Sequence, residues 1–327
     1  MGKIEFPREG YGGINRRQVW IEKQYYTSIN VRIDKRLKQL FDERADVKEK
    51  CATRYMRLHL KEILLGSPEK LVEIKQYVLN RYLGIFDDRS DGSYNKRVLW
   101  AFDFEGYRKD KLVRLAKWLD VKTCPYCNAH YTLYLDEKDV KKHPEGLAKF
   151  QFDHFLNKAD APFLSMSLYN LIPSCAVCNG SKSGADWPIE LNPYVTDISS
   201  LYTFRLYKPY RLWSGTKPKG AIKVLLKPNS SVYKKIVETL DHDVHLSKRY
   251  GRHWDVAQDM FNRAYTYPYY SNPDNFKNML APLDVDKFKQ IWMGTSPDKS
   301  DIDNRPLTKF MQDMWNQASG LIGMKRP

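Results

Sequence analysis

Four cysteines form two Cys-x-x-Cys pairs, Cys124–Cys127 and Cys175–Cys178, with 47 residues between the pairs. Each pair lets two thiolates reach one tetrahedral ion, and two pairs fill all four positions. Because closed coordination leaves no position for water, the spacing predicts a structural zinc site. A redox-active thiol pair is the alternative, but that chemistry needs one pair beside a thioredoxin-like pattern. The fifth cysteine, Cys51, is expected to be a small buried hydrophobic residue.

Side chains suited to acid–base and cation chemistry lie close to these cysteines. Asp153 and His154 are neighbours, Asn170 lies sixteen residues after His154, and Asn179 directly follows Cys178. Taken singly, each has an ordinary structural explanation. An Asp-His pair is commonly a surface pair or a satisfied buried hydrogen bond, while the two asparagines would be a strand-entry residue and a helix cap.

Together, in this order and within the cysteine frame, these residues resemble the motif of the HNH, or ββα-metal, endonucleases whose motif is braced by a four-cysteine zinc site. The family has Asp-His at the end of one strand, Asn at the start of a second, and His or Asn in the first turn of a helix. The resemblance implies that His154 is the general base and that Asp153 and Asn179 hold one Mg²⁺ or Mn²⁺. It implies that Asn170 fixes the loop that carries His154.

The chemistry of phosphodiester hydrolysis agrees with these roles. The reaction needs a base that titrates near neutrality, which His supplies, and a cation with oxygen ligands. Asp153 and His154 would point to opposite faces of a regular strand, so both serve one site only at a bulge or a strand end. Lys182, one turn beyond Asn179, is expected to bind phosphate near the helix N-terminus.

Secondary structure is expected to be mostly helical outside the motif. Apolar residues three and four apart predict helices over about 29–65, 68–84 and 108–119, whereas residues 1–27 show no period. Alternating or β-branched segments predict strands at 129–135 and 149–155, and a third short apolar run lies at 171–173. Residues 201–228 are expected to be extended, and the rest of the chain is expected to be mostly helical.

The fold class expected from this pattern is α+β. A zinc-braced ββα-metal nuclease core, residues 121–195, lies between a mostly helical N-terminal region, 1–120, and a basic, largely helical C-terminal region, 196–327. The HNH resemblance covers the core alone.

The formal net charge is +15, and it is unevenly distributed. The segment with both cysteine pairs, 121–200, is slightly acidic, whereas 1–120 and 201–260 are basic. Basic flanks predict a polyanionic partner, DNA first, with RNA not excluded and a membrane surface less favoured. No segment is long and apolar enough for a spanning helix and the N-terminus resembles no signal peptide, so a cytoplasmic protein is expected.

The flanks resemble, more loosely, uncharacterised HNH proteins of bacterial anti-phage defence, including the HNH partner of Septu-type ATPases. This resemblance implies a defence effector that works with an ATPase subunit. Two alternatives stay open. One is a stand-alone restriction-type or homing-type HNH enzyme, and the other is a zinc-ribbon nucleic-acid-binding module without catalysis.

Overall fold

The computed structural model describes residues 3–4, 16–108, 110–135, 146–209, 222–270 and 285–321. The chain divides into two compact units, which we describe separately. The first unit comprises Lys3–Val121 and Thr132–Thr196, and the second comprises Met1–Gly2, Lys122–Tyr131 and Asp197–Pro327.

Helices make up most of the first unit. They are α1 (Arg16–Glu43), α2 (Val47–Leu58), α3 (Leu60–Leu65), α4 (Pro68–Arg81), α5 (Tyr94–Phe102), α6 (Phe104–Tyr107) and α7 (Lys111–Leu119). The expected break before residue 68 is present, with Ser67 as N-cap and Pro68 at the first helical position. Residues 16–27, expected to be irregular, are the first turns of α1, so that expectation is wrong.

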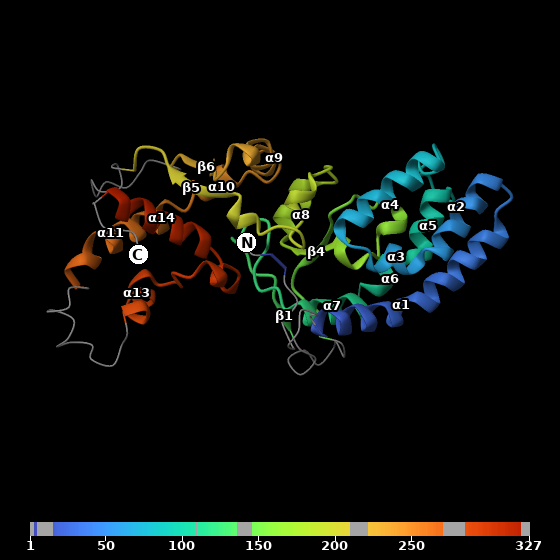
Figure 1. Ribbon diagram of the computed structural model, residues 1–327, viewed down its shortest axis with the longest axis horizontal. Coiled ribbons are helices and arrows are strands. Elements are labelled where there is room, and N and C mark those ends of the chain that lie inside the picture. Colours follow the sequence, from blue (N-terminus) through green and yellow to red (C-terminus); the bar gives the residue numbers. More distant parts are fainter. Residues whose placement is uncertain are drawn as a thin grey trace. The chain divides into compact units, whose positions relative to one another are not determined.

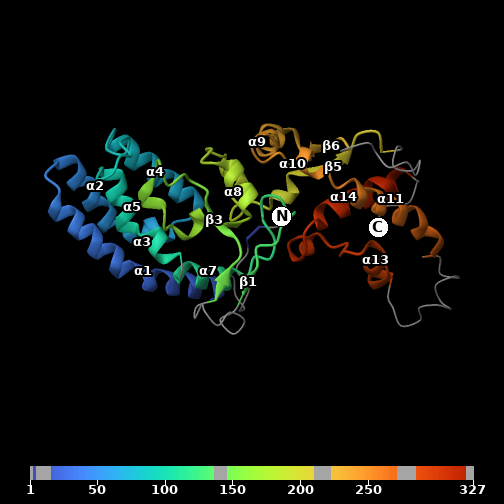
Figure 2. The same ribbon diagram turned by 180° about the vertical axis from the view of Figure 1, so that it is seen from behind.

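The long helix α1 organises this helical region. Its buried residues recur every three or four positions and form one stripe: Ile21, Tyr25, Ile29, Ile33, Leu37 and Leu40. Helices α2, α3, α5 and α7 contact α1 and lie along it in both ribbon views (Figures 1 and 2). Apolar burial along this stripe therefore fixes the positions of the other helices.

A ββα unit follows the helical region in the chain. Strands β3 (Gln151–His154) and β4 (Leu171–Ser174) pair antiparallel, with Asp153 opposite Ile172 and His154 opposite Leu171. Helix α8 (Ala176–Lys182) follows β4 after one residue and contacts β3. The strand expected at 149–155 is confirmed as the shorter β3, and the apolar run at 171–173 lies in β4.

The strand expected at 129–135 is mostly absent. Only Tyr134–Leu135 forms a strand, β1, which pairs with β2 (Leu147–Ala148). Residues 124–130 instead form a turn closed by the hydrogen bond from Cys124 N to His130 O at 2.9 Å. The geometry of the cysteine turn thus overrides the strand propensity of this segment.

The helical region and the ββα unit share one core. Helix α7 contacts β1 and β2, and α5 contacts the 3₁₀ helix η2 (Pro162–Leu164) between β3 and β4. The sequence predicts two separate regions, 1–120 and 121–195, whereas most of both lies in the first unit. The first unit ends at Thr196, next to the expected boundary before residue 196.

The second unit combines one hairpin with helices. Its elements are β5 (Tyr202–Leu206), β6 (Val224–Pro228), α9 (Lys234–Val244), α10 (Leu246–Tyr250), α11 (Trp254–Tyr270), α13 (Val285–Met293), η8 (Lys299–Asn304) and α14 (Thr308–Leu321). Helix α14 packs on α11 and β5. Its Asp313 and Gln317 accept hydrogen bonds from Phe204 N and Leu206 N, so α14 satisfies the free edge of β5.

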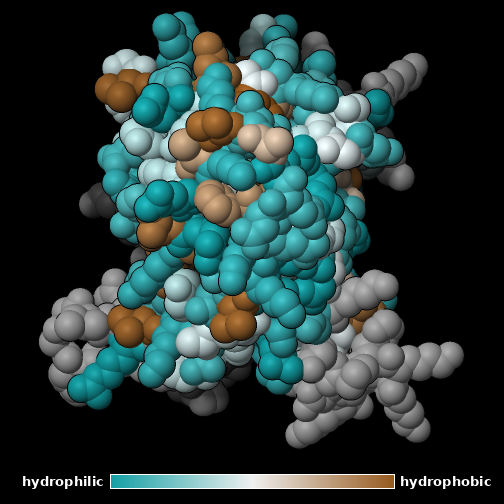
Figure 3. Space-filling model, turned by 90° about the vertical axis from the view of Figure 1, so that its right-hand side faces the viewer, coloured by the Kyte–Doolittle hydropathy of each residue, from teal (hydrophilic) through white to brown (hydrophobic). Residues whose placement is uncertain are grey.

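The α+β class expected from the sequence is confirmed, since the described helices are combined with three small two-stranded sheets. Among the described helices, none combines the length and hydropathy that crossing a bilayer requires. The face shown in Figure 3 is mainly hydrophilic, with hydrophobic residues scattered among polar ones.

Candidate metal centre and active-site pocket

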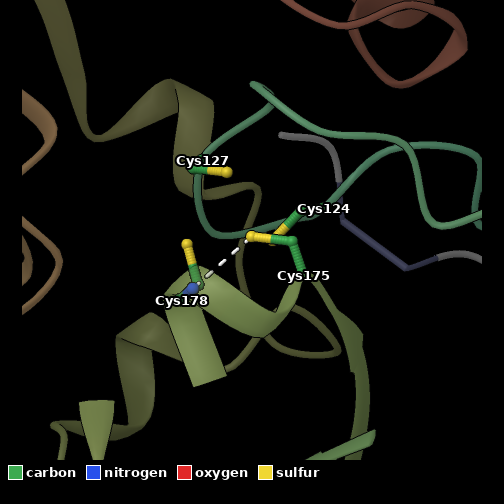
Figure 4. Close-up of side chains that lie close together, drawn as sticks. All are labelled: Cys124, Cys127, Cys175 and Cys178. Atoms are coloured by element: carbon green, nitrogen blue, oxygen red, sulfur yellow. Dashed lines mark hydrogen bonds between the residues drawn. The ribbon is translucent and has the colours of Figure 1, made fainter. Parts of the chain in front are cut away.

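The four paired cysteines come together. The Sγ atoms of Cys124, Cys127, Cys175 and Cys178 all lie within 4.8 Å of one another, and all four residues are buried. Figure 4 shows the four sulfur atoms gathered around a common space. A tetrahedral site with Zn–S bonds of about 2.3 Å needs sulfur atoms about 3.8 Å apart. The cluster therefore fits a closed four-thiolate site after small side-chain adjustments.

Backbone N–H groups support two of these sulfur atoms. Cys178 N donates to Cys175 Sγ at 3.4 Å, which makes Cys175 the N-cap of α8, and Ala129 N donates to Cys127 Sγ at 3.4 Å. Such N–H donors stabilise thiolates that carry negative charge. The cysteine set thus has the chemistry of a zinc site, and a metal such as zinc fits it.

The remaining cysteine, Cys51, differs from its expected environment. It lies on α2 and is exposed, so the expectation of a buried hydrophobic residue is wrong. Apolar spacing in the sequence did not indicate which face of α2 is packed. Cys51 is useful as a control because it does not belong to the four-cysteine cluster.

The predicted catalytic residues lie on the ββα unit. Asp153 and His154 are the last two residues of β3, Asn170 directly precedes β4, and Asn179 lies on α8. The strand end expected from the Asp-His dipeptide is present, because β3 keeps a regular register and ends at His154. Asp153, His154 and Asn179 line one pocket of about 800 Å³ in the first unit.

His154 is held at the inner side of this pocket. Its Nε2 lies 3.0 Å from the carbonyl oxygen of Ser165, and its ring meets the ring of Phe104 at a centroid distance of 4.5 Å. A carbonyl oxygen only accepts, so Nε2 carries the proton and Nδ1 carries the lone pair. Burial, and then the nearby Lys158 ammonium, lower the pKa of His154 to about 3, so the imidazole is neutral at neutral pH. The expected titration near neutrality is therefore not found, because the ring is buried beside a cation.

Asn170 braces the segment that follows His154. Its Oδ1 accepts from Leu156 N at 2.6 Å, while its Nδ2 donates to Leu156 O at 3.1 Å and Leu164 O at 2.9 Å. The backbone of Asn170 also accepts from Phe155 N at 2.9 Å. These are side-chain to backbone hydrogen bonds of the kind that the HNH resemblance implies for this position.

Lys182 has a different environment from the one expected. It is the last residue of α8, and its buried Nζ donates to His154 O at 2.9 Å and Phe155 O at 3.1 Å. Its ammonium also lies 3.4 Å from Asp153 Oδ2. The expected phosphate contact is therefore wrong, because the Lys182 ammonium is buried against the carbonyl oxygens at the end of β3.

Asp153 and Asn179 contribute oxygen atoms to the same pocket. Asp153 is 4% exposed and its carboxylate is near the Lys182 ammonium. Asn179 is partly exposed, and its Nδ2 donates to Gln151 Oε1 at 2.6 Å, which leaves Oδ1 as its acceptor. One carboxylate and one amide oxygen suit a hard divalent cation that keeps several water ligands.

Three further residues of the pocket did not stand out in the sequence. Phe104 lies against His154, while Lys158 and Arg108 place cations on the same pocket. Lys158 follows His154 by four residues, in the loop after β3, and this proximity was the one available signal. Phe104 and Arg108 come from the helical region, so only the packing of α6 and the loop after it reveals them.

Comparisons with protein-family models, with curated proteins and with solved structures gave no match to this chain.

Proposed function

We propose that this protein is a metal-dependent endonuclease of the HNH type that hydrolyses phosphodiester bonds in nucleic acid. The observation that carries the proposal is the β3–β4–α8 arrangement, in which Asp153, His154 and Asn179 line one pocket and Asn170 braces the loop behind it. The buried four-cysteine cluster next to Asn179 in the sequence supports the same assignment.

In this proposal, His154 takes a proton from the attacking water. Its neutral ring donates Nε2–H to Ser165 O, and this hydrogen bond fixes the orientation that leaves Nδ1 as the proton acceptor. Phe104 excludes water from one side of the ring. Asn170 keeps the loop in place, so that the base stays aligned with the substrate.

Asp153 and Asn179 are the residues that would hold Mg²⁺ or Mn²⁺. When bound, the cation supplies charge neutralisation at the scissile phosphate and the leaving oxygen. Lys182 lies beside the Asp153 carboxylate and donates to the backbone at the end of β3, so it would hold that carboxylate in place. The four cysteines would hold zinc in a purely structural role.

The decisive experiment is a cleavage assay with the full-length chain. Purified protein is incubated with plasmid DNA, single-stranded DNA and RNA in Mg²⁺ or Mn²⁺, in parallel with His154→Ala and with His59→Ala, a surface histidine on the segment between α2 and α3. Loss of the base lowers the rate by about 100-fold or more, whereas His59→Ala keeps it. Equal rates for wild type and His154→Ala contradict the proposal, and so does inactivity of both with every cation and with the products of neighbouring genes added.

A second candidate is a non-catalytic zinc-dependent module that binds nucleic acid. The observation in its favour is the buried Lys182–Asp153 pair, because an ammonium already partners the carboxylate that would bind the cation. Binding of DNA or RNA that needs zinc and is never followed by cleavage would support this candidate.

The biological role that we propose is defence against phage, with an ATPase subunit as partner. Both proposals derive from the resemblance of the flanks to defence-associated HNH proteins. A plaque assay in bacteria that express the chain together with its neighbouring genes tests them. Protection that depends on both His154 and a neighbouring ATPase gene is the expected result, and protection by the His154→Ala chain contradicts it.

A further inference from the structure

The pocket beside His154 has an aromatic wall. Phe104, Phe150 and Phe152 line it together with His154. The rings of Phe150 and Phe152 meet edge to face at 5.3 Å, and both residues are partly exposed. Partly exposed phenylalanines inside a pocket are costly in water, but they form a surface on which a flat ring can stack.

Cationic side chains border this aromatic wall. The Nζ of Lys158 lies 4.6 Å from the centre of the Phe104 ring, and its side chain is 38% exposed. Glu105 lies 3.7 Å from Lys158 and 3.4 Å from Arg108, so one carboxylate faces two cations. The two cations therefore attract a phosphate to this part of the rim, whereas Asp153 adds a second carboxylate elsewhere in the pocket.

The dimensions of the pocket favour a single nucleotide over a duplex. Its volume of about 800 Å³ lies within the range of roughly 300–1,000 Å³ that is typical of pockets for small ligands. His154, at its inner side, is only 9% exposed. A base within a duplex can enter such a pocket only if it leaves the stack, and this costs unpairing and unstacking energy.

We propose that this pocket binds an unpaired nucleotide, with the base on the partly exposed rings of Phe150 and Phe152 and its phosphate near Lys158 and Arg108. The substrate class is then unpaired DNA or RNA: a single strand, a loop or an end. This inference rests on the proposed nuclease function and specifies its substrate.

The test measures binding separately from cleavage. Full-length His154→Ala protein is titrated with a fluorescent ten-nucleotide single strand, as DNA and as RNA, and with the matching DNA duplex, without divalent cation. We expect the DNA or RNA single strand to bind at least about tenfold more tightly than the duplex. Adding Phe150→Ala weakens single-strand binding by about tenfold, in line with base–aromatic stacking. Phe150→Tyr retains the affinity, and the control Tyr77→Ala, at an exposed residue of α4, does not change it.

Two results would overturn the inference: duplex binding as tight as single-strand binding, or unchanged single-strand affinity in Phe150→Ala.

Thermal unfolding checks that each variant is folded. If Phe150→Ala is not, quenching of 2-aminopurine in the single strand by His154→Ala protein reports stacking directly, and no quenching rejects the proposal. Wild-type protein that cleaves duplex as fast as single strands keeps the nuclease function but rejects this substrate class. Absence of all cleavage, also with the products of neighbouring genes added, rejects the nuclease function. The binding measurements then test the nucleotide pocket by themselves. The single strand that binds more tightly, DNA or RNA, shows whether the pocket prefers deoxyribose or ribose.

Discussion

Asn170 shows how one side chain positions a candidate catalytic group without reacting. Its amide makes hydrogen bonds with Leu156 N, Leu156 O and Leu164 O, all of them buried. An alanine at this position removes the side-chain partner of Leu156 N and Leu156 O, whereas Leu164 O still accepts from Ser167 N at 3.1 Å. Each unsatisfied buried group costs about 1–3 kcal/mol.

We therefore predict that Asn170→Ala lowers the free energy of unfolding by about 2–4 kcal/mol, measured by urea denaturation. Asn170→Asp places a buried carboxylate oxygen against two carbonyl oxygens, so we expect a loss at least as large. Asn80→Ala, on the exposed side of α4, changes stability by about 0.5 kcal/mol or less. If Asn170→Ala is as stable as Asn80→Ala, the bracing role is refuted.

The environment of an individual residue could be predicted from the sequence where its motif fits few structures. Two Cys-x-x-Cys pairs predicted the four-cysteine cluster, and the Asp-His dipeptide predicted a strand end. Lys182 was misplaced because its burial depends on how α8 packs against the end of β3, a contact between residues 28 positions apart in the chain. Phe104 was missed because its role depends on contact with His154, fifty residues later in the chain.

Between elements, the buried ion pair of Lys182 and Asp153 attaches the end of α8 to the end of β3. The Lys182 side chain lies near the rings of Phe155 and Trp187. Its ammonium donates to two backbone carbonyl oxygens and to the Asp153 carboxylate. Removing one partner of such a pair leaves a buried charge uncompensated.

Lys182→Met is therefore expected to lower the free energy of unfolding by about 3 kcal/mol or more, measured by urea denaturation. Adding Asp153→Asn removes the uncompensated charge and restores most of that loss. The exposed pair of Lys70 and Glu73 provides the matched control, since Lys70→Met costs less than about 1 kcal/mol. Equal effects of Lys182→Met and Lys70→Met would show that the buried pair does not stabilise the fold.

Helices were more predictable than strands, for a physical reason. The buried stripes of α1, α4 and α7 repeat every three or four residues, and this period is local. Strand β1 is shorter than expected because residues 124–130 are engaged in the cysteine turn, a constraint that propensity does not contain. The partition into two units depends on which surfaces pack together, so the sequence pattern alone did not reveal it.

For the molecule as a whole, the cysteine cluster makes metal content a measurable property. Replacing one thiolate opens the tetrahedral site and removes one strong ligand. We predict that Cys175→Ser loses zinc and unfolds at a lower temperature, as determined by metal analysis and calorimetry. Cys51→Ser, which lies outside the cluster, retains one equivalent of zinc. One full equivalent in Cys175→Ser would contradict the four-thiolate site.

The net charge of +15 becomes more specific once exposed cations are located. In the second unit, Lys208 and Lys223 lie 5.3 Å and 4.9 Å from the ring of Tyr207, which is 52% exposed at the end of β5. An exposed aromatic ring beside two lysines is suited to contact with a nucleic-acid backbone and its bases. We therefore expect this end of the hairpin to contribute to affinity.

The prediction concerns the salt dependence of binding, measured with His154→Ala protein so that no cleavage occurs. Each lost phosphate contact reduces the slope of log K against log salt by about 0.7 for a single strand. Lys208→Gln with Lys223→Gln should thus reduce the slope by about 1.4 if each lysine contacts one phosphate. Lys61→Gln with Lys96→Gln, two exposed positions of the first unit, changes the net charge equally and serves as control. If both double variants reduce the slope equally, overall charge governs binding and the hairpin has no special part. If only Lys208→Gln with Lys223→Gln reduces the slope, the basic hairpin binds the polyanion. The same two substitutions in the wild-type background should then raise KM, while the rate at saturating substrate stays the same.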